Sequence, residues 1–94
     1  MGRIEASAIQ FQMPNSSFWH TLTAKRHADI YELLFRYQIP YNPQTLIEGF
    51  VTSNNQFIDR RDAVYEAIDA SQLPIDFDGR FLYSGDLWPE EDEE

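Results

Sequence analysis

Two stretches with the residue spacing of an amphipathic helix, each ended by a proline, place the strongest limit on how this chain folds. The first begins at Ala24 and ends before Pro40, and the second begins after Asp59, reaches about Ser71 and ends before Pro74. Proline has no amide hydrogen to donate, and it disfavours helical conformation in the residue before it. The pattern therefore predicts two helices joined by a segment with a different structure.

The remaining apolar segments have the short length and partial alternation of β-strands. They cover residues 3–13, 18–22, 46–53, 56–58 and 81–83. Elements in this order give the scheme ββ-α-ββ-α-β. The predicted fold class is α+β, with a small antiparallel sheet packed against two helices.

Local signals set the expected boundaries of these elements. Thr23 is expected to cap the first helix, and Asp59 the second, with Asp62 completing a pattern like a capping box. The change of apolar phase at Ala8–Ile9 predicts a bulge in the first strand. Asn54-Asn55 predicts a two-residue hairpin turn, because asparagine tolerates the positive φ that such a turn needs.

The composition is that of a single intracellular domain. The chain has 94 residues and no cysteine, which excludes disulfides and cysteine metal sites and favours a reducing compartment. No apolar run approaches the roughly 20 residues of a membrane span. We expect a cytoplasmic domain over residues 1–88 and a disordered acidic tail over residues 89–94.

The acidic balance opposes nonspecific binding to nucleic acid. The formal net charge is −9, and five of the sixteen acidic residues are Glu90, Glu91, Asp92, Glu93 and Glu94. The rest of the chain carries about −4, and a field of that sign repels a phosphate backbone. It leaves room for a local site that binds a small anion.

The few cations cluster at the predicted helix starts. Of seven basic residues, Lys25 and Arg26 follow the first expected cap, together with His27, and Arg60 and Arg61 follow the second. A helix start already carries about half a positive charge, so a cation there is unfavourable by roughly 0.3–1 kcal/mol. Free amide groups and guanidinium groups at one place suit a phosphate or carboxylate, which predicts an anion site.

Each of these residues also has an ordinary structural interpretation. The cations are equally consistent with surface ion pairs, to Asp29 and Glu32 in the first cluster and to Asp59 and Asp62 in the second. A lone histidine such as His27 is more often a packing residue than a ligand. Asp86 suits either a ribose hydroxyl or a turn, and most of the many aromatic residues belong to a core, with one or two left to stack on a base.

No catalytic or metal-binding motif is present. The sequence has no GxSxG, P-loop, GxGxxG or HExxH pattern and no cysteine–histidine pair. We therefore expect a protein that is not an enzyme and has no metal or cofactor.

Three blocks of sequence resemble a family of short proteins encoded by phages and prophages. The blocks are Arg26-His27 with Ile30, then residues 49–53 with 57–60 and Ala63, and finally residues 82–84 with 86–88. They occur in the expected order, and the resemblance as a whole spans the chain from the first strand to Trp88. The resemblance implies a phage origin and a role directed at the host, and its blocks coincide with much of the anion site.

The leading hypothesis is a phage accessory protein that holds a small anionic, nucleotide-like ligand between the two helix starts and sequesters a host immune signal. The candidate ligand-binding residues are Lys25, Arg26, His27, Asp59, Arg60, Arg61 and Asp86. One small domain encloses a ligand poorly, so the site is also compatible with a homo-oligomer interface.

The alternative hypothesis is an acidic inhibitor that imitates nucleic acid. The charge of −9 and the run Glu90–Glu94 suit a basic groove on a host nuclease, polymerase or defence protein. Deletion of the tail separates the two hypotheses, because only the mimic depends on it.

Overall fold

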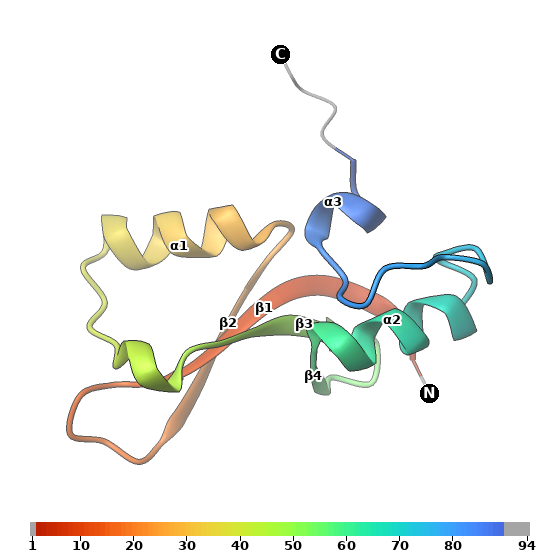
Figure 1. Ribbon diagram of the computed structural model, residues 1–94. Helices are drawn as coiled ribbons and strands as arrows, with labels where there is room; N and C mark the ends of the chain where they lie inside the picture. The colour runs from red at the N-terminus through yellow and green to blue at the C-terminus, as the bar shows by residue number, and fades with distance from the viewer. Residues whose placement is uncertain (1, 90–94) are drawn as a thin grey trace.

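The computed structural model describes residues 2–89 as an α+β domain, which confirms the predicted fold class (Figure 1). Its elements are β1 (Ile4–Gln12), β2 (Trp19–Ala24), α1 (His27–Arg36), a 3₁₀ turn (Pro43–Thr45), β3 (Ile47–Thr52), β4 (Phe57–Asp59), α2 (Arg60–Asp69) and α3 (Ser84–Leu87). The strands form one antiparallel sheet in the order β2-β1-β3-β4. The acidic run Glu90–Glu94 lies outside the described residues.

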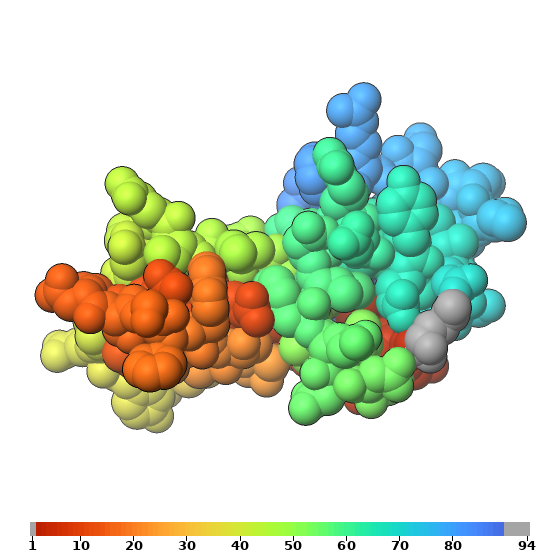
Figure 2. All heavy atoms as spheres, turned by 90° about the horizontal axis from the view of Figure 1, so that it is seen from below, coloured from red at the N-terminus to blue at the C-terminus, as the bar shows by residue number. Residues whose placement is uncertain are grey.

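Both long helices pack on the same face of the sheet. Ile9 contacts α1 in one apolar cluster, and Phe50 contacts α2 in another. Phe50 pairs with Ser7, two positions from Ile9, so the two side chains share a face. The molecule therefore has two halves side by side, one built on β1, β2 and α1 and the other on β3, β4 and α2 (Figure 2).

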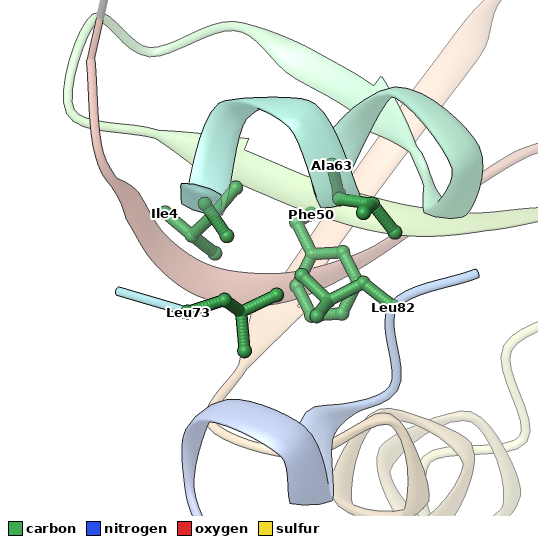
Figure 3. Packing of buried hydrophobic residues seen from close by; sticks show 7 residues of the cluster. Ile4, Phe50, Ala63, Leu73 and Leu82 are labelled. Atoms are coloured by element: carbon green, nitrogen blue, oxygen red, sulfur yellow. The ribbon is translucent and has the colours of Figure 1, made fainter. Parts of the chain in front are cut away.

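The core of the α2 half surrounds Phe50. Side chains of Ile4, Ala63, Leu73 and Leu82 converge on its ring, and all of them are buried (Figure 3). These residues come from β1, α2 and the segments after α2, so this cluster joins the two ends of the described chain. Truncating such a buried phenylalanine to alanine typically costs about 3–5 kcal/mol.

The α1 half confirms the predicted N-terminal hairpin but not its details. β1 and β2 pair without interruption from Ser7 opposite Ala24 to Gln12 opposite Trp19. The irregularity in β1 lies between Ile4 and Ala6 against β3, whereas the sequence indicated Ala8–Ile9. The apolar phase misled the prediction because Ala8 and Ile9 are both fully buried, one on each side of the strand.

The first helix starts later than predicted. Thr23 belongs to β2, where it pairs with Ala8, and α1 begins at His27 with Arg26 in the N-cap position. Arg26 makes no side-chain cap bond there; instead Ser84 Oγ accepts a hydrogen bond from the amide of His27 (3.2 Å). The second helix follows the prediction, because the side chain of Asp59 accepts from the amide of Asp62 (2.8 Å).

Two further sequence predictions are wrong. In the β3–β4 turn only Asn55 has a positive φ (63°), and its amide donates to Thr52, so the turn is longer than two residues. Residues 81–83 are not a strand of the sheet. The amide of Leu82 donates to the carbonyl of Arg60, and that of Tyr83 to Asp86 Oδ2, which leads directly into α3.

Candidate functional site

Arg60, the first residue of α2, points inward and is bound by the chain itself. Its Nε and Nη2 atoms donate to Glu48 Oε1 (3.1 and 2.7 Å), and Nη1 donates to the carbonyl of Leu82 (2.6 Å). The guanidinium carbon lies 4.6 Å from the centre of the Tyr83 ring. Only 16% of the arginine side chain is exposed. The anion expected beside this helix start is therefore a carboxylate of the same chain.

Glu48 is held ionised by its neighbours. Burial by itself would raise the pKa of this carboxyl, but hydrogen bonds from Tyr31 and Arg60 and the positive charge of Arg60 lower it below its usual value. The pKa of Tyr31 is raised, mainly by burial of its hydroxyl and further by the hydrogen bond to Glu48. The carboxylate thus links α1, through Tyr31, to the start of α2.

His27 occupies the centre of the same region. Its Nε2–H donates to the carbonyl of Gly49 (2.8 Å), and Nδ1 accepts from Ser84 Oγ (2.9 Å) and Arg60 Nη2 (3.3 Å). This pattern fits the neutral ring. Burial is the largest influence on the pKa of His27 and lowers it; the bond to Gly49 opposes this shift, and the repulsion of Arg60 adds to it, so the pKa is lowered overall.

Ser7 extends these contacts into β1. Its hydroxyl donates to the carbonyl of Lys25 and lies 2.9 Å from Ser84 Oγ. We call the six side chains described here the polar network: Ser7, His27, Tyr31, Glu48, Arg60 and Ser84. It connects the sheet, α1, α2 and α3.

Gly49 makes the close packing of this region possible. A Cβ atom at this position would lie 2.1 Å from the carbonyl oxygen of Ile58 and 3.0 Å from Cα of Asp59. Both are backbone atoms that cannot move aside cheaply. Any side chain at position 49 would therefore separate β4 from β3 and shift the carbonyl that His27 binds.

The structure divides the predicted ligand-binding residues into two groups. Arg26, His27 and Arg60 converge on residues 82–88, which pass between the starts of α1 and α2 (Figure 1); Arg26 donates to the carbonyl of Trp88. The other four are exposed: Lys25, Asp59, Arg61 and Asp86. The carboxylates of Asp59 and Asp86 accept hydrogen bonds from backbone amides. The space between the helix starts is thus filled by the chain's own segment.

A different surface gathers cations and aromatic rings. A groove between α2 and the segment before α3 is lined by arginines, aromatic residues, one acidic residue and a few apolar or small ones, and we call it the aromatic groove. Its lining residues are Arg61, Arg80, Tyr65, Phe77, Phe81, Asp78, Val64, Ile68 and Gly79. Tyr65 is 69% exposed and Phe81 43%. Neither Arg61 nor Arg80 makes a hydrogen bond or ion pair with any residue in the described range 2–89.

Sequence reasoning included Arg61 but missed the rest of this groove. Arg61 and Tyr65 are four residues apart on α2 and so lie on one side of the helix. Phe77 and Phe81 lie on either side of Gly79 and Arg80, and the chain bends at Arg80 and Phe81. The sequence signal that could have revealed the groove is Tyr65, an aromatic residue on the polar side of α2 one turn after Arg61.

Within residues 2–89 no helix is long and apolar enough to cross a membrane, and no group of three or more histidine or acidic side chains is arranged to hold a metal ion. Fold and surface together define a small α+β protein with an internal polar network and a surface groove that carries two arginines and three aromatic residues.

The chain belongs to the Phage T4 y16D protein family, whose model matches residues 3–88. This match confirms the resemblance to phage proteins. No curated protein and no solved structure matches the chain.

Proposed function

We propose that this phage protein works by binding a small anionic, nucleotide-like ligand in the aromatic groove, and that it is not an enzyme. This moves the site from the space between the two helix starts to the outer side of α2. Arg61, in the first turn of α2, belongs to both versions of the site.

One observation carries the proposal: two arginines without a partner in the described chain border the same groove. Arg60 binds Glu48, and Arg36 binds Glu32, but Arg61 and Arg80 bind no carboxylate of residues 2–89. A guanidinium group forms paired, charge-assisted hydrogen bonds with phosphate oxygens. The neighbouring rings of Tyr65 and Phe81 offer faces on which a base can stack, at about 1–3 kcal/mol per base.

The internal contacts argue against catalysis at the one pair that resembles a nucleophile and its base. Ser84 Oγ lies 2.9 Å from His27 Nδ1, yet each residue is only 7% exposed. The second ring nitrogen of His27 is occupied by Gly49. A substrate would have to displace residues 82–88 before it reached the hydroxyl.

The family gives this binding activity a biological setting. A phage protein acts in an infected cell. The nucleotide-like molecules in such a cell include the signals that host immunity uses. Sequestration of such a signal requires binding only, which suits a small domain with an open groove. This setting and the chemistry of the groove support the proposed role in counter-defence.

The test is a titration of the full chain with a panel of nucleotides, including cyclic nucleotides and ADP-ribose, by isothermal calorimetry. We expect at least one to bind, and Arg61→Ala and Arg80→Ala each to weaken it by about 10-fold or more. Lys25→Ala is the matched control, because Lys25 is an exposed cation outside the groove.

Three results would contradict the proposal. The first is that no nucleotide of the panel binds, and the second is that Arg61→Ala and Arg80→Ala bind with the affinity of the parent chain. The third is that Lys25→Ala loses as much affinity as the arginine variants, which would indicate only a general effect of charge.

A further inference from the structure

The two edges of the sheet differ in how well they are protected against pairing with another strand. At one edge β4 has three residues, ends in Asp59 and leads directly into α2. At the other edge β2 has six residues, with the sequence Trp19-His20-Thr21-Leu22-Thr23-Ala24. It contains no acidic residue, lysine, arginine or proline, and its ladder with β1 has no bulge. Natural edge strands usually carry at least one such feature, because a bare edge pairs with other strands.

The backbone groups that face this free edge can be identified from the ladder. The amide and carbonyl of Gln12 in β1 point toward the β3 side of the sheet. The amide donates to Thr45 Oγ1, and the carbonyl accepts from the amide of Asn42. Alternate residues of an antiparallel strand face opposite sides, so Phe11 and Ile9 bond β2. Their partners are His20 and Leu22. The amides and carbonyls of Trp19, Thr21 and Thr23 consequently point away from the sheet.

We infer that β2 pairs antiparallel with β2 of a second copy of this chain, around a twofold axis at Thr21. Thr21 then faces Thr21 of the second copy, and Trp19 faces the copy's Thr23 on each side of the axis. Because these are the outward-facing residues, the arrangement makes about six new backbone hydrogen bonds. The result is a continuous sheet through both copies.

Side chains and charge favour a second copy over a different partner. Thr21, Trp19 and Thr23 lie on one face of the strand and are all exposed, Trp19 by 51%. Threonine–threonine and aromatic–threonine pairs across strands contribute roughly 0.2–1 kcal/mol each. The chain carries −9, yet the edge places no acidic side chain of either copy opposite another. The hairpin forms the end of the molecule away from α2 (Figure 2).

This interface is separate from the aromatic groove, since β2 and α2 lie at opposite edges of the sheet. A dimer therefore neither requires nor demonstrates ligand binding, and each proposal can fail alone. The closed edge also removes a row of unpaired backbone groups that would otherwise favour aggregation.

The test is sedimentation equilibrium of the full chain, for which we expect twice the mass of one chain. Thr21→Lys places two like charges together at the axis and should raise the dimer Kd by about 10-fold or more. Gln10→Lys is the matched control: Gln10 pairs with Thr21 across β1 and β2, on the same face but inside the sheet. A mixture of Thr21→Lys and Thr21→Glu should restore the dimer.

Amide hydrogen exchange of the unmodified chain tests the interface without any variant. The amides of Trp19, Thr21 and Thr23 should become protected as the concentration rises, whereas that of Leu22 should be protected throughout. A monomer at all concentrations, a dimer that Thr21→Lys leaves intact, or fast exchange of these amides in the dimer would overturn the inference.

Discussion

Two neighbouring arginines at the start of α2 have different surroundings. Arg60 enters the polar network, where Glu48, Leu82 and Tyr83 occupy its guanidinium group. Arg61 borders the aromatic groove and has no partner in the described chain. Both are in the first turn of α2 and share the same helix dipole. The difference shows that the neighbours of a cation at a helix start, and not its position on the helix, decide whether the chain itself binds that cation.

Loss of Arg60 should be the most damaging change to the polar network. Arg60→Ala leaves Glu48 ionised and partly buried without its cation, which should lower the free energy of unfolding by about 3 kcal/mol. Urea denaturation of the variant and the parent chain measures this. A change below about 1 kcal/mol would mean that the carboxylate is well solvated without the arginine.

Loss of the Ser84 hydroxyl should have a smaller effect. Ser84→Ala removes the acceptor for the amide of His27 and the contacts with His27 Nδ1 and Ser7, so we expect a loss of about 2 kcal/mol. Ser17→Ala, at an exposed position in the β1–β2 loop, is the control and should leave stability unchanged. Equal effects of the two substitutions would argue against Ser84 as the tertiary cap of α1.

Acidification should weaken the polar network through His27. Its pKa is lower in the folded chain than in the unfolded chain, so the unfolded state binds more protons between the two values. The stabilisation is complete above pH about 6.5 and is lost as the pH falls toward the folded pKa, by at most about 1.4 kcal/mol per pH unit.

Denaturation at several pH values measures this slope. His27→Gln should flatten the slope between pH 7 and 5.5, while His20→Gln should keep it. An unchanged slope in His27→Gln would assign the pH dependence to other groups.

The smallest effect is expected in the aromatic groove. Arg61→Ala removes no hydrogen bond or ion pair with residues 2–89, so the free energy of unfolding should stay within about 0.5 kcal/mol of the parent value. The same denaturation series that includes Arg60→Ala measures it. A large loss of stability would show that Arg61 belongs to the structure and would remove the contrast between the two neighbours.

The elements that local chemistry determines could be predicted from the sequence. Both helices end before the prolines as expected, α1 at Arg36 and α2 at Asp69. Asp59 caps α2 by accepting from the amide of Asp62, three positions on. The start of α1 could not be predicted, because its acceptor is Ser84, 57 residues away. Thr23 has the right side chain for a cap, but its pairing with Ala8 keeps it in β2.

The candidate site shows the same limit. Sequence reasoning grouped Arg26, His27 and Arg60 in one ligand site, and the structure brings these residues to one segment of the chain. The sequence could not identify Glu48 as the partner of Arg60, since Glu48 looks like an ordinary polar residue in a strand. The only sign was that Glu48 lies within an apolar run of a chain with few cations, which indicates that one of these cations binds its carboxylate.

The segment from Leu82 to Trp88 has a consequence for how the chain matures. Ser84 reaches back 57 residues to His27 and 77 to Ser7, and Trp88 reaches back 62 to Arg26. Contacts so distant along the chain form late, because the intervening loop must close first. During synthesis, the β1–β2 hairpin and α1 therefore leave the ribosome long before residues 82–88, and the acceptor for the first amide of α1 is missing until that segment follows.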